Sequence, residues 1–253
     1  VEMVSATMLT QLDRAAQSAS ISTGTYPVLF TPHGVGVAFM MPVLVAFNGK
    51  NVVEQSSRLV GRQGEKLFDP ALTVYDDSTL EGRPTSSPFD DEGVPTRRVN
   101  LIENGVVGEF LFDLQTAGQA GADTTGSGRR NDGRSQVRPG TSTVIVESGV
   151  IPFAQLLAGM DEGLVVEELI GAGQGNLLAG DFGGNVLLGY KVENGRITGR
   201  VKDTMIAGNI FDVLGRGVAV GDDARWVGST LWTPSLLSEG VSVSAGGGAA
   251  CHS

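Results

Sequence analysis

The chain has 253 residues, which is enough for one or two domains with a substantial buried core. Hydrophobic residues make up 41% and charged residues 18%, which excludes a disordered chain, and the net charge of −10 argues against general nucleic-acid binding. The 37 glycines have no three-residue period, which excludes collagen, and they lie between apolar runs, which predicts many tight turns between short strands.

Apolar residues at helical spacing predict a helix over 2–19, which is followed by a short strand over 26–31 and a second helix near 35–47. Further strands are predicted at 72–75, 99–103, 106–113, 141–147, 163–170, 185–192, 196–202, 226–233 and 241–245, and further helices at 152–159 and 207–218. The polar, Gly-rich segments 76–97 and 115–140 are predicted to be loops. These elements indicate a β-rich α+β fold with a few helices.

Two Asn-Gly pairs, Asn104-Gly105 and Asn194-Gly195, stand between apolar runs. Asn-Gly is the strongest local signal for a two-residue hairpin, because both residues accept a positive φ. The surrounding segments, 102–108 and 192–199, are also alike. Two explanations stay open: an internal duplication, and two independent hairpins that need the same turn chemistry.

Residues for metal or nucleophilic chemistry are scarce. The two histidines, His33 and His252, are far apart in the sequence, so the usual zinc helix with two histidines one turn apart is missing. A site built only of carboxylates could use Asp76, Asp77, Asp90, Asp91 and Glu92, but these lack EF-hand spacing and are predicted to be a solvated acidic loop. The single cysteine, Cys251, lies in a Gly/Ala-rich tail and can form no intramolecular disulfide, which fits a reducing compartment.

Two further segments suggest anion binding. The glycines of 171–175 follow an apolar strand, but more glycines come directly afterwards, and these exclude the helix that a dinucleotide site needs. The long loop carries four arginines: Arg129, Arg130, Arg134 and Arg138. Guanidinium groups suit carboxylates, phosphates and backbone carbonyls. A subunit interface, a ligand site and a solvated loop all stay open for this cluster.

Several motifs in order resemble the C-terminal domain of the TldD/PmbA family, the "modulator of DNA gyrase" proteins. The first three are Phe89–Pro95, Leu101–Gly105 and Thr125–Arg130. The later ones are 180–182, 192–195, 201–202, 207–209 and 220–223. The resemblance covers nearly the whole chain, and it implies a mostly antiparallel, barrel-like domain.

The resemblance also implies a two-subunit zinc protease of the cytoplasm that cleaves unfolded peptides. In that family the TldD-like subunit carries an H-E-x-x-x-H helix, and the PmbA/TldE-like subunit lacks it. The histidine and glutamate positions of that helix correspond here to Met40, Met41 and Val45. The resemblance therefore implies a non-catalytic PmbA/TldE-type subunit that holds no cofactor, with zinc expected only in a TldD-like partner.

The same resemblance suggests how the chain is divided. Residues 1–25 would be a linking helix, 26–245 the C-terminal domain and 246–253 a flexible tail, and the family's N-terminal domain is absent from this sequence. The candidates for peptide binding or subunit contact are Thr125, Gly126, Arg129, Arg130, Asp181 and Phe182.

One alternative function stays open beside the subunit role. The chain could be a self-assembling structural or peptide-binding module, which forms homo-oligomers and has no catalytic partner. An enzyme of another class would need an acid–base or nucleophile set that the sequence does not supply. No apolar run reaches 18 residues, so the chain is expected to stay off the membrane and in the cytoplasm.

Overall fold

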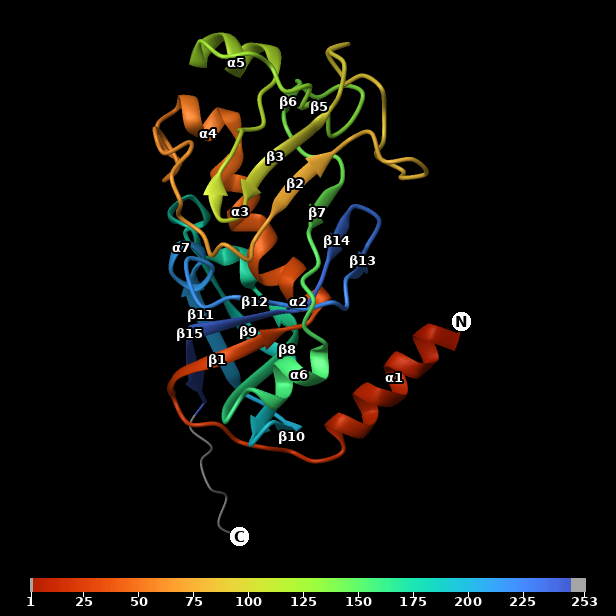
Figure 1. Ribbon diagram of the computed structural model, residues 1–253, viewed down its shortest axis with the longest axis vertical. Coiled ribbons are helices and arrows are strands. Elements are labelled where there is room, and N and C mark those ends of the chain that lie inside the picture. The colour runs from red at the N-terminus through yellow and green to blue at the C-terminus, as the bar shows by residue number, and fades with distance from the viewer. Residues whose placement is uncertain (1, 247–253) are drawn as a thin grey trace.

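The computed structural model describes residues 2–246, and its side chains from residue 8 onward. The predicted tail, with Cys251 and His252, lies outside the described residues except for its first glycine. Two β-sheets form the body, and a helical segment joins them (Figure 1).

Five strands close into a barrel in the lower half of Figure 1. In order of pairing they are β1 (Gly24–Phe30), β8 (Glu162–Ile170), β9 (Asp181–Glu193), β11 (Thr204–Asn209) and β15 (Leu236–Ala245). Strand β1 also pairs with β15, which closes the sheet on itself. Within the described barrel, the β1–β8 pairing is parallel and the others are antiparallel. The predicted β-rich, barrel-like fold is therefore confirmed.

Alternating burial along the barrel strands shows why the sheet closes. In β11, Thr204 and Ile206 are buried, whereas Met205 and Ala207 are exposed. A period of two places every second side chain inside, where it is removed from water with its neighbours. The short strands β10 (Arg196–Arg200) and β12 (Ala219–Val220) extend the barrel by pairing with β9 and β15.

A second sheet lies above the barrel (Figure 1). Its strands, in spatial order, are β13 (Arg225–Val227), β14 (Leu231–Thr233), β7 (Val144–Val146), β2 (Val74–Asp77), β3 (Arg98–Glu103) and β4 (Val106–Val107). A separate two-stranded ribbon consists of β5 (Gly128–Arg129) and β6 (Arg138–Pro139). The two Asn-Gly turns have positive φ at both residues, as predicted, and they lie in different sheets.

A continuous helical segment over residues 32–47 connects the barrel to the upper sheet (Figure 1). It consists of α2 (Pro32–Val35), a π-helical turn (Gly36–Met40) and α3 (Met41–Phe47). Pro42 has no N–H to donate to the preceding turn, and a widened π turn directly before it accommodates the ring. The segment is anchored in the core, because Phe39 and Phe47 are fully buried.

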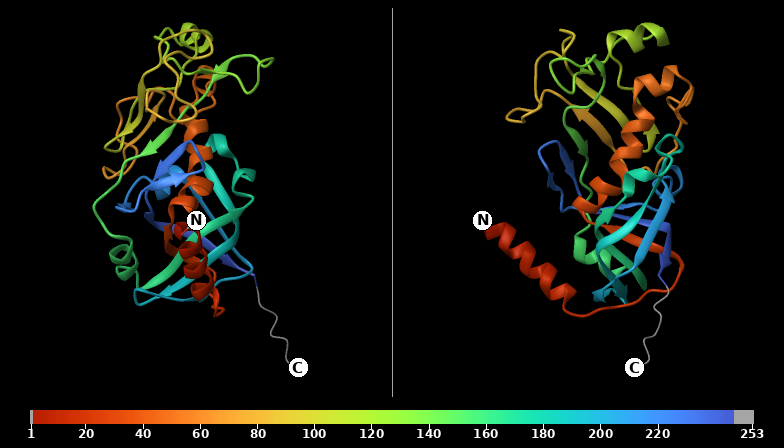
Figure 2. Two further views of the ribbon diagram at one scale, coloured as in Figure 1. Left: turned by 90° about the vertical axis from the view of Figure 1, so that its right-hand side faces the viewer. Right: turned by 180° about the vertical axis from the view of Figure 1, so that it is seen from behind.

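The other helices are short, apart from the first. They are α1 (Glu2–Ala15), α4 (Gly49–Val53), α5 (Leu114–Ala120), α6 (Phe153–Ala158) and α7 (Ile210–Val213), with 3-10 turns at Ala172–Gln174 and Leu177–Ala179. Helix α1 reaches out from the side of the barrel (Figure 2). No helix of the described chain is long and apolar enough to cross a membrane.

The predicted helix over 207–218 is wrong. Residues up to 209 belong to strand β11, and helix α7 occupies only the turn from Ile210 to Val213. Pairing with β15 over 204–207 and with β9 over 205–209 decides the conformation of this segment, because a strand satisfies its backbone groups through its neighbours. The Asn209 side chain then caps α7 by accepting from the Phe211 N–H.

Three other expected elements also differ from the structure. The strand predicted over 106–113 pairs with β3 only at 106–107, as β4. Farther along, the chain leaves this sheet, and the Leu111 N–H bonds to the carbonyl of Phe47 at the end of α3. The strand predicted over 226–233 is a hairpin, β13–β14, with Gly228 at a positive φ. The loop predicted over 115–140 contains most of helix α5 and both strands of the β5–β6 ribbon.

Candidate functional site

The three positions expected to correspond to a metal helix lie on the segment that joins the two sheets. Met40 is 9% exposed, Met41 is 56% exposed and Val45 is half-buried. A thioether and an alkyl group do not supply the nitrogen, thiolate or carboxylate ligands that zinc takes, and neither can act as a general base. These side chains therefore do not fit a zinc ion.

Other side chains of the described structure do not supply the zinc ligands that these three positions lack. His33 begins the same segment, and its Nε2 lies 2.5 Å from the carboxylate of Glu168 on β8. That pair is two ligands at most, whereas a protein zinc site needs three or more. Within the described part of the chain no group of three His, Cys, Asp or Glu side chains could hold a metal.

The carboxylates of the acidic run 90–92 accept hydrogen bonds from the backbone of the loop that carries the four arginines. Asp90 is 6% exposed, and its carboxylate accepts from the backbone N–H groups of Glu92, Val94 and Gly128. Asp91 accepts from the backbone N–H of Arg130 at 2.7 Å. The prediction of a solvated acidic loop is wrong for Asp90, because three backbone donors offset the cost of burying its charge. It is also wrong for Asp76 and Asp77 on β2, which are 1% and 8% exposed.

Glu92 extends this arrangement to helix α5. Its Oε2 accepts from the Leu114 N–H at 2.7 Å, at the N-terminus of the helix, where a negative charge is favourable. Asp113 caps the same helix through a capping box with Thr116. The carboxylates of residues 90–92 thus bind the backbone at the start of α5 and at the start of the loop that carries the four arginines.

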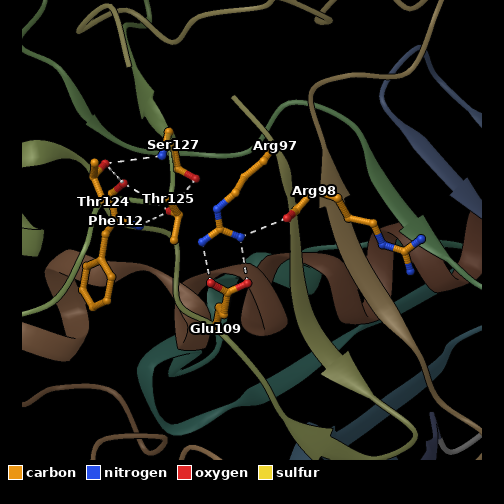
Figure 3. A network of polar contacts seen from close by, with 8 residues as sticks. Arg97, Arg98, Glu109, Phe112, Thr124, Thr125 and Ser127 are labelled. Atoms are coloured by element: carbon orange, nitrogen blue, oxygen red, sulfur yellow. Dashed lines mark hydrogen bonds and ion pairs between the residues drawn. The ribbon is translucent and has the colours of Figure 1, made fainter. Parts of the chain in front are cut away.

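Thr125 and Gly126 position the loop that leads into β5, and Figure 3 shows Thr125 beside Phe112 and Ser127. The Thr125 hydroxyl accepts from the Phe112 N–H at 2.8 Å and lies 2.9 Å from the Ser127 hydroxyl. Gly126 has a φ of +67°, and a Cβ there would lie 2.6 Å from the carbonyl of Pro95. Both residues are buried, so the structure gives them a role in holding the backbone.

A bidentate ion pair braces the chain beside this loop (Figure 3). Arg97 donates to both carboxylate oxygens of Glu109, at 2.8 and 2.5 Å. This hydrogen bonding raises the pKa of Arg97, so the guanidinium stays charged. The pair ties the start of β3 to the segment that follows β4, at the surface where both side chains are partly exposed.

Arg129 belongs to a buried polar chain that reaches Asp76 on β2. Its Nη2 donates to the Ser78 hydroxyl at 2.7 Å, Ser78 donates to Ser142 at 2.8 Å, and Ser142 donates to Asp76. Burial raises the pKa of Asp76 to about 6, although its hydrogen bonds with Ser142 and the charge of Arg129 oppose that shift. The sequence did not reveal this network, because residues 76–78 lie more than 50 positions from Arg129 and Ser142 and meet them only in the folded structure.

Asp181 and Phe182 stabilise the barrel at the start of β9. The Asn209 amide donates to the Asp181 carboxylate at 2.8 Å. Phe182 is 2% exposed, and its ring centroid lies 5.1 Å from that of Phe39. A side chain this deeply buried offers no surface to a peptide. Arg130 is the exposed member of the predicted set, and its Nη1 donates to the Ser135 carbonyl at 2.6 Å.

The profile of the PmbA/TldA metallopeptidase C-terminal domain matches residues 23–245 of the chain. The chain belongs to this family. A relative named as a metalloprotease in Methanocaldococcus jannaschii is 31% identical over 90% of this chain and 49% of its own length. The metalloprotease PmbA of Escherichia coli O157:H7 is 30% identical over 80% of this chain and 42% of its own length.

Solved structures agree with this family assignment. The crystal structure of TldE from Thermococcus kodakarensis superposes with a TM-score of 0.82 at 27% identity, over 94% of this chain and 54% of that one. A Thermotoga maritima protein described as a modulator of a DNA gyrase gives a TM-score of 0.77 at 34% identity, over 90% of this chain and 51% of that one. The chain thus spans about half the length of the family relatives it matches.

Proposed function

We propose that this chain is the non-catalytic, PmbA/TldE-type subunit of a cytoplasmic two-subunit zinc peptidase that acts on unfolded peptides. The observation that carries the proposal is the chemistry of Met40, Met41 and Val45 at the positions expected for the metal helix. The chain keeps the domain of a metallopeptidase family without the side chains for zinc. Zinc and the general base would then come from a TldD-like partner.

An exposed apolar surface beside helix α3 supports the partner role. Met41 is 56% exposed, and its Cε lies 4.0 Å from where a Cβ on Gly173 would be. Ile170 and Leu178, at either end of the neighbouring turns, are 55% and 41% exposed. Apolar side chains gathered in this way mark interaction surfaces in soluble proteins.

Helix α1 carries the observation that favours the alternative function, a self-assembling module. Its side chains Met8, Leu9 and Leu12 are 59%, 62% and 67% exposed. On a helix these positions lie close to one another, and a second copy of the chain could cover them. In that case the chain would form a homo-oligomer and bind peptides without any catalytic partner.

Mixing the chain with a TldD-like subunit tests the proposal. The purified chain alone should hold no stoichiometric zinc by elemental analysis and should not cleave an unfolded, fluorescently quenched peptide. Cleavage should appear on mixing, and a TldD-like subunit with its metal-helix glutamate changed to glutamine should abolish it, because the base would then be lost.

Two outcomes would contradict the subunit role. One is a full equivalent of zinc on the purified chain, together with cleavage by the chain alone. The other is a homo-oligomer, measured by size-exclusion chromatography with light scattering, that neither binds nor activates the TldD-like subunit. The second result would favour the self-assembling module.

A further inference from the structure

Two arginines face one another across the β5–β6 ribbon. Arg129 and Arg138 are paired in register, directly opposite on adjacent strands. Like charges in this position repel one another and destabilise a ribbon. Neither guanidinium makes an ion pair with any carboxylate of the side chains described over 8–246. Arg129 reaches the buried carboxylate of Asp76 through Ser78 and Ser142, so the fold holds two adjacent positive charges with no carboxylate bonded directly to either.

The backbone of this ribbon is firmly anchored. Asp90 accepts from the Gly128 N–H at 2.9 Å, and the Gly140 N–H donates to Ser127 at 2.9 Å. On the other strand, the Asn48 amide donates to the carbonyl of Pro139 at 2.9 Å. The nearby carboxylates of Asp90 and Asp91 are engaged by backbone N–H groups rather than by the guanidinium groups. Such anchoring fixes the backbone positions from which the two arginine side chains extend, and this lowers the entropy cost of binding.

The two arginines line a cavity of about 340 Å³ together with Asn131, Ser135 and Gln136. Arg129 lies partly inside the protein, with its Nη2 bonded to Ser78 and its Nε buried without a hydrogen-bond partner in the described chain. Arg138 is exposed, and its side chain makes no hydrogen bond to the described residues. One arginine thus forms a fixed wall of the cavity, and the other is free to close on a ligand.

A second cavity, of about 280 Å³, continues from the first. Gln136 and Arg138 line both, and the second extends to Lys50 and to two further amides, Gln115 and Gln119. Side-chain amides can both donate to and accept from a peptide backbone. The second cavity is also lined by the carboxylates of Glu54 and Asp113, and the Lys50 Nζ lies 3.6 Å from Glu54. The positive charges that make no ion pair are therefore those of Arg129 and Arg138 in the first cavity, and the second cavity adds amides.

We propose that the Arg129–Arg138 cavity binds a carboxylate of an acidic peptide, whose backbone continues along the amides of the second cavity. Guanidinium forks match the planar carboxylate and form strong, charge-assisted hydrogen bonds with it. The net charge of −10 gives the chain no extended positive field, which disfavours nucleic acid as the source of the anion. This proposal deepens the subunit role, because peptides are the substrates of the complex proposed above.

Fluorescence anisotropy on the isolated full chain tests the cavity without any partner. The probes are a labelled, C-terminally amidated peptide with two glutamates among glycines and serines, the same peptide with glutamines, and the glutamine peptide with a free C-terminus. The glutamate peptide should bind about tenfold more tightly than its amidated glutamine analogue. Tight binding of the free-acid glutamine peptide would assign the site to C-terminal carboxylates, which also supports the proposal.

Two arginine variants distinguish binding in the cavity from general electrostatic attraction of an acidic peptide to the protein surface. Arg138→Gln should weaken binding of the glutamate peptide about tenfold. Its circular dichroism should be unchanged and its melting temperature no lower than that of the wild type, because the exposed Arg138 side chain makes no hydrogen bond to the described residues and its repulsion with Arg129 is removed. Arg134→Gln removes the same charge from the same loop but lies outside the cavity lining, and it should bind as the wild type does.

Equal affinity for the glutamate peptide and both glutamine peptides would overturn the proposal, and so would equal losses in the two variants. Because zinc and the TldD-like subunit are absent from this assay, its failure is distinguishable from a failure of the mixing experiment.

Discussion

Replacing Phe182 with alanine should lower the free energy of unfolding by about 3–5 kcal/mol. The ring is 2% exposed and packs edge-on against Phe39 and Phe30, with centroids 5.1 and 6.4 Å away. These three rings come from β9, the π-helical turn and β1, so alanine would leave a cavity where the barrel meets the helical segment. Equilibrium unfolding in urea, followed by circular dichroism, measures the loss.

A matched substitution on the surface shows whether burial causes this effect. Phe89 is 53% exposed, so Phe89→Ala should change the free energy of unfolding by no more than about 0.5 kcal/mol. Phe182→Leu keeps most of the volume and should recover much of the stability lost in the alanine variant. If Phe182→Ala unfolded at the wild-type urea concentration, the buried aromatic cluster would be refuted.

Asp76→Asn should remove a pH dependence of stability between about pH 4 and pH 6. The folded-state pKa of Asp76 is raised to about 6 from an ordinary value of 3.8, mainly because the carboxylate is buried. Between these values the folded state holds the proton that the unfolded state has released. Protonation thus stabilises the fold below pH 4, and this stabilisation is lost as the pH rises through 6.

The size of this effect follows from the pKa difference. A shift of about two units corresponds to roughly 3 kcal/mol, which the wild type should lose relative to Asp76→Asn between pH 4 and pH 7. The asparagine can still accept from the Ser142 N–H, which donates to Asp76 at 2.8 Å. Urea denaturation of both proteins across this pH range gives the difference.

An exposed carboxylate serves as the control for this measurement. Asp123→Asn removes the same formal charge at the surface, and its unfolding should follow the wild-type pH profile. Parallel pH profiles for the wild type and Asp76→Asn would show that Asp76 is not responsible for the pH dependence. A wild type that becomes more stable relative to Asp76→Asn between pH 4 and 7 would reverse the sign derived above.

The sequence alone determined the features that depend on neighbours along the chain. The Asn104-Gly105 and Asn194-Gly195 turns form as predicted, because their φ values of +48° to +81° are set by residue type. The order of motifs was likewise enough to place the chain in its family. Met40, Met41 and Val45 could be recognised as unable to bind zinc without any structure, because their side-chain chemistry is local.

Only the tertiary structure decided which polar residues are buried and which charges meet. Residues 204–209 form a strand rather than a helix because they pair with β15 over 204–207 and with β9 over 205–209. Asp90 is buried because Gly128, far along the chain, donates to it. Arg129 and Arg138 face each other only when the ribbon closes. In each case contacts between distant segments outweigh local propensity, since burial and pairing energies exceed the small differences in intrinsic preference.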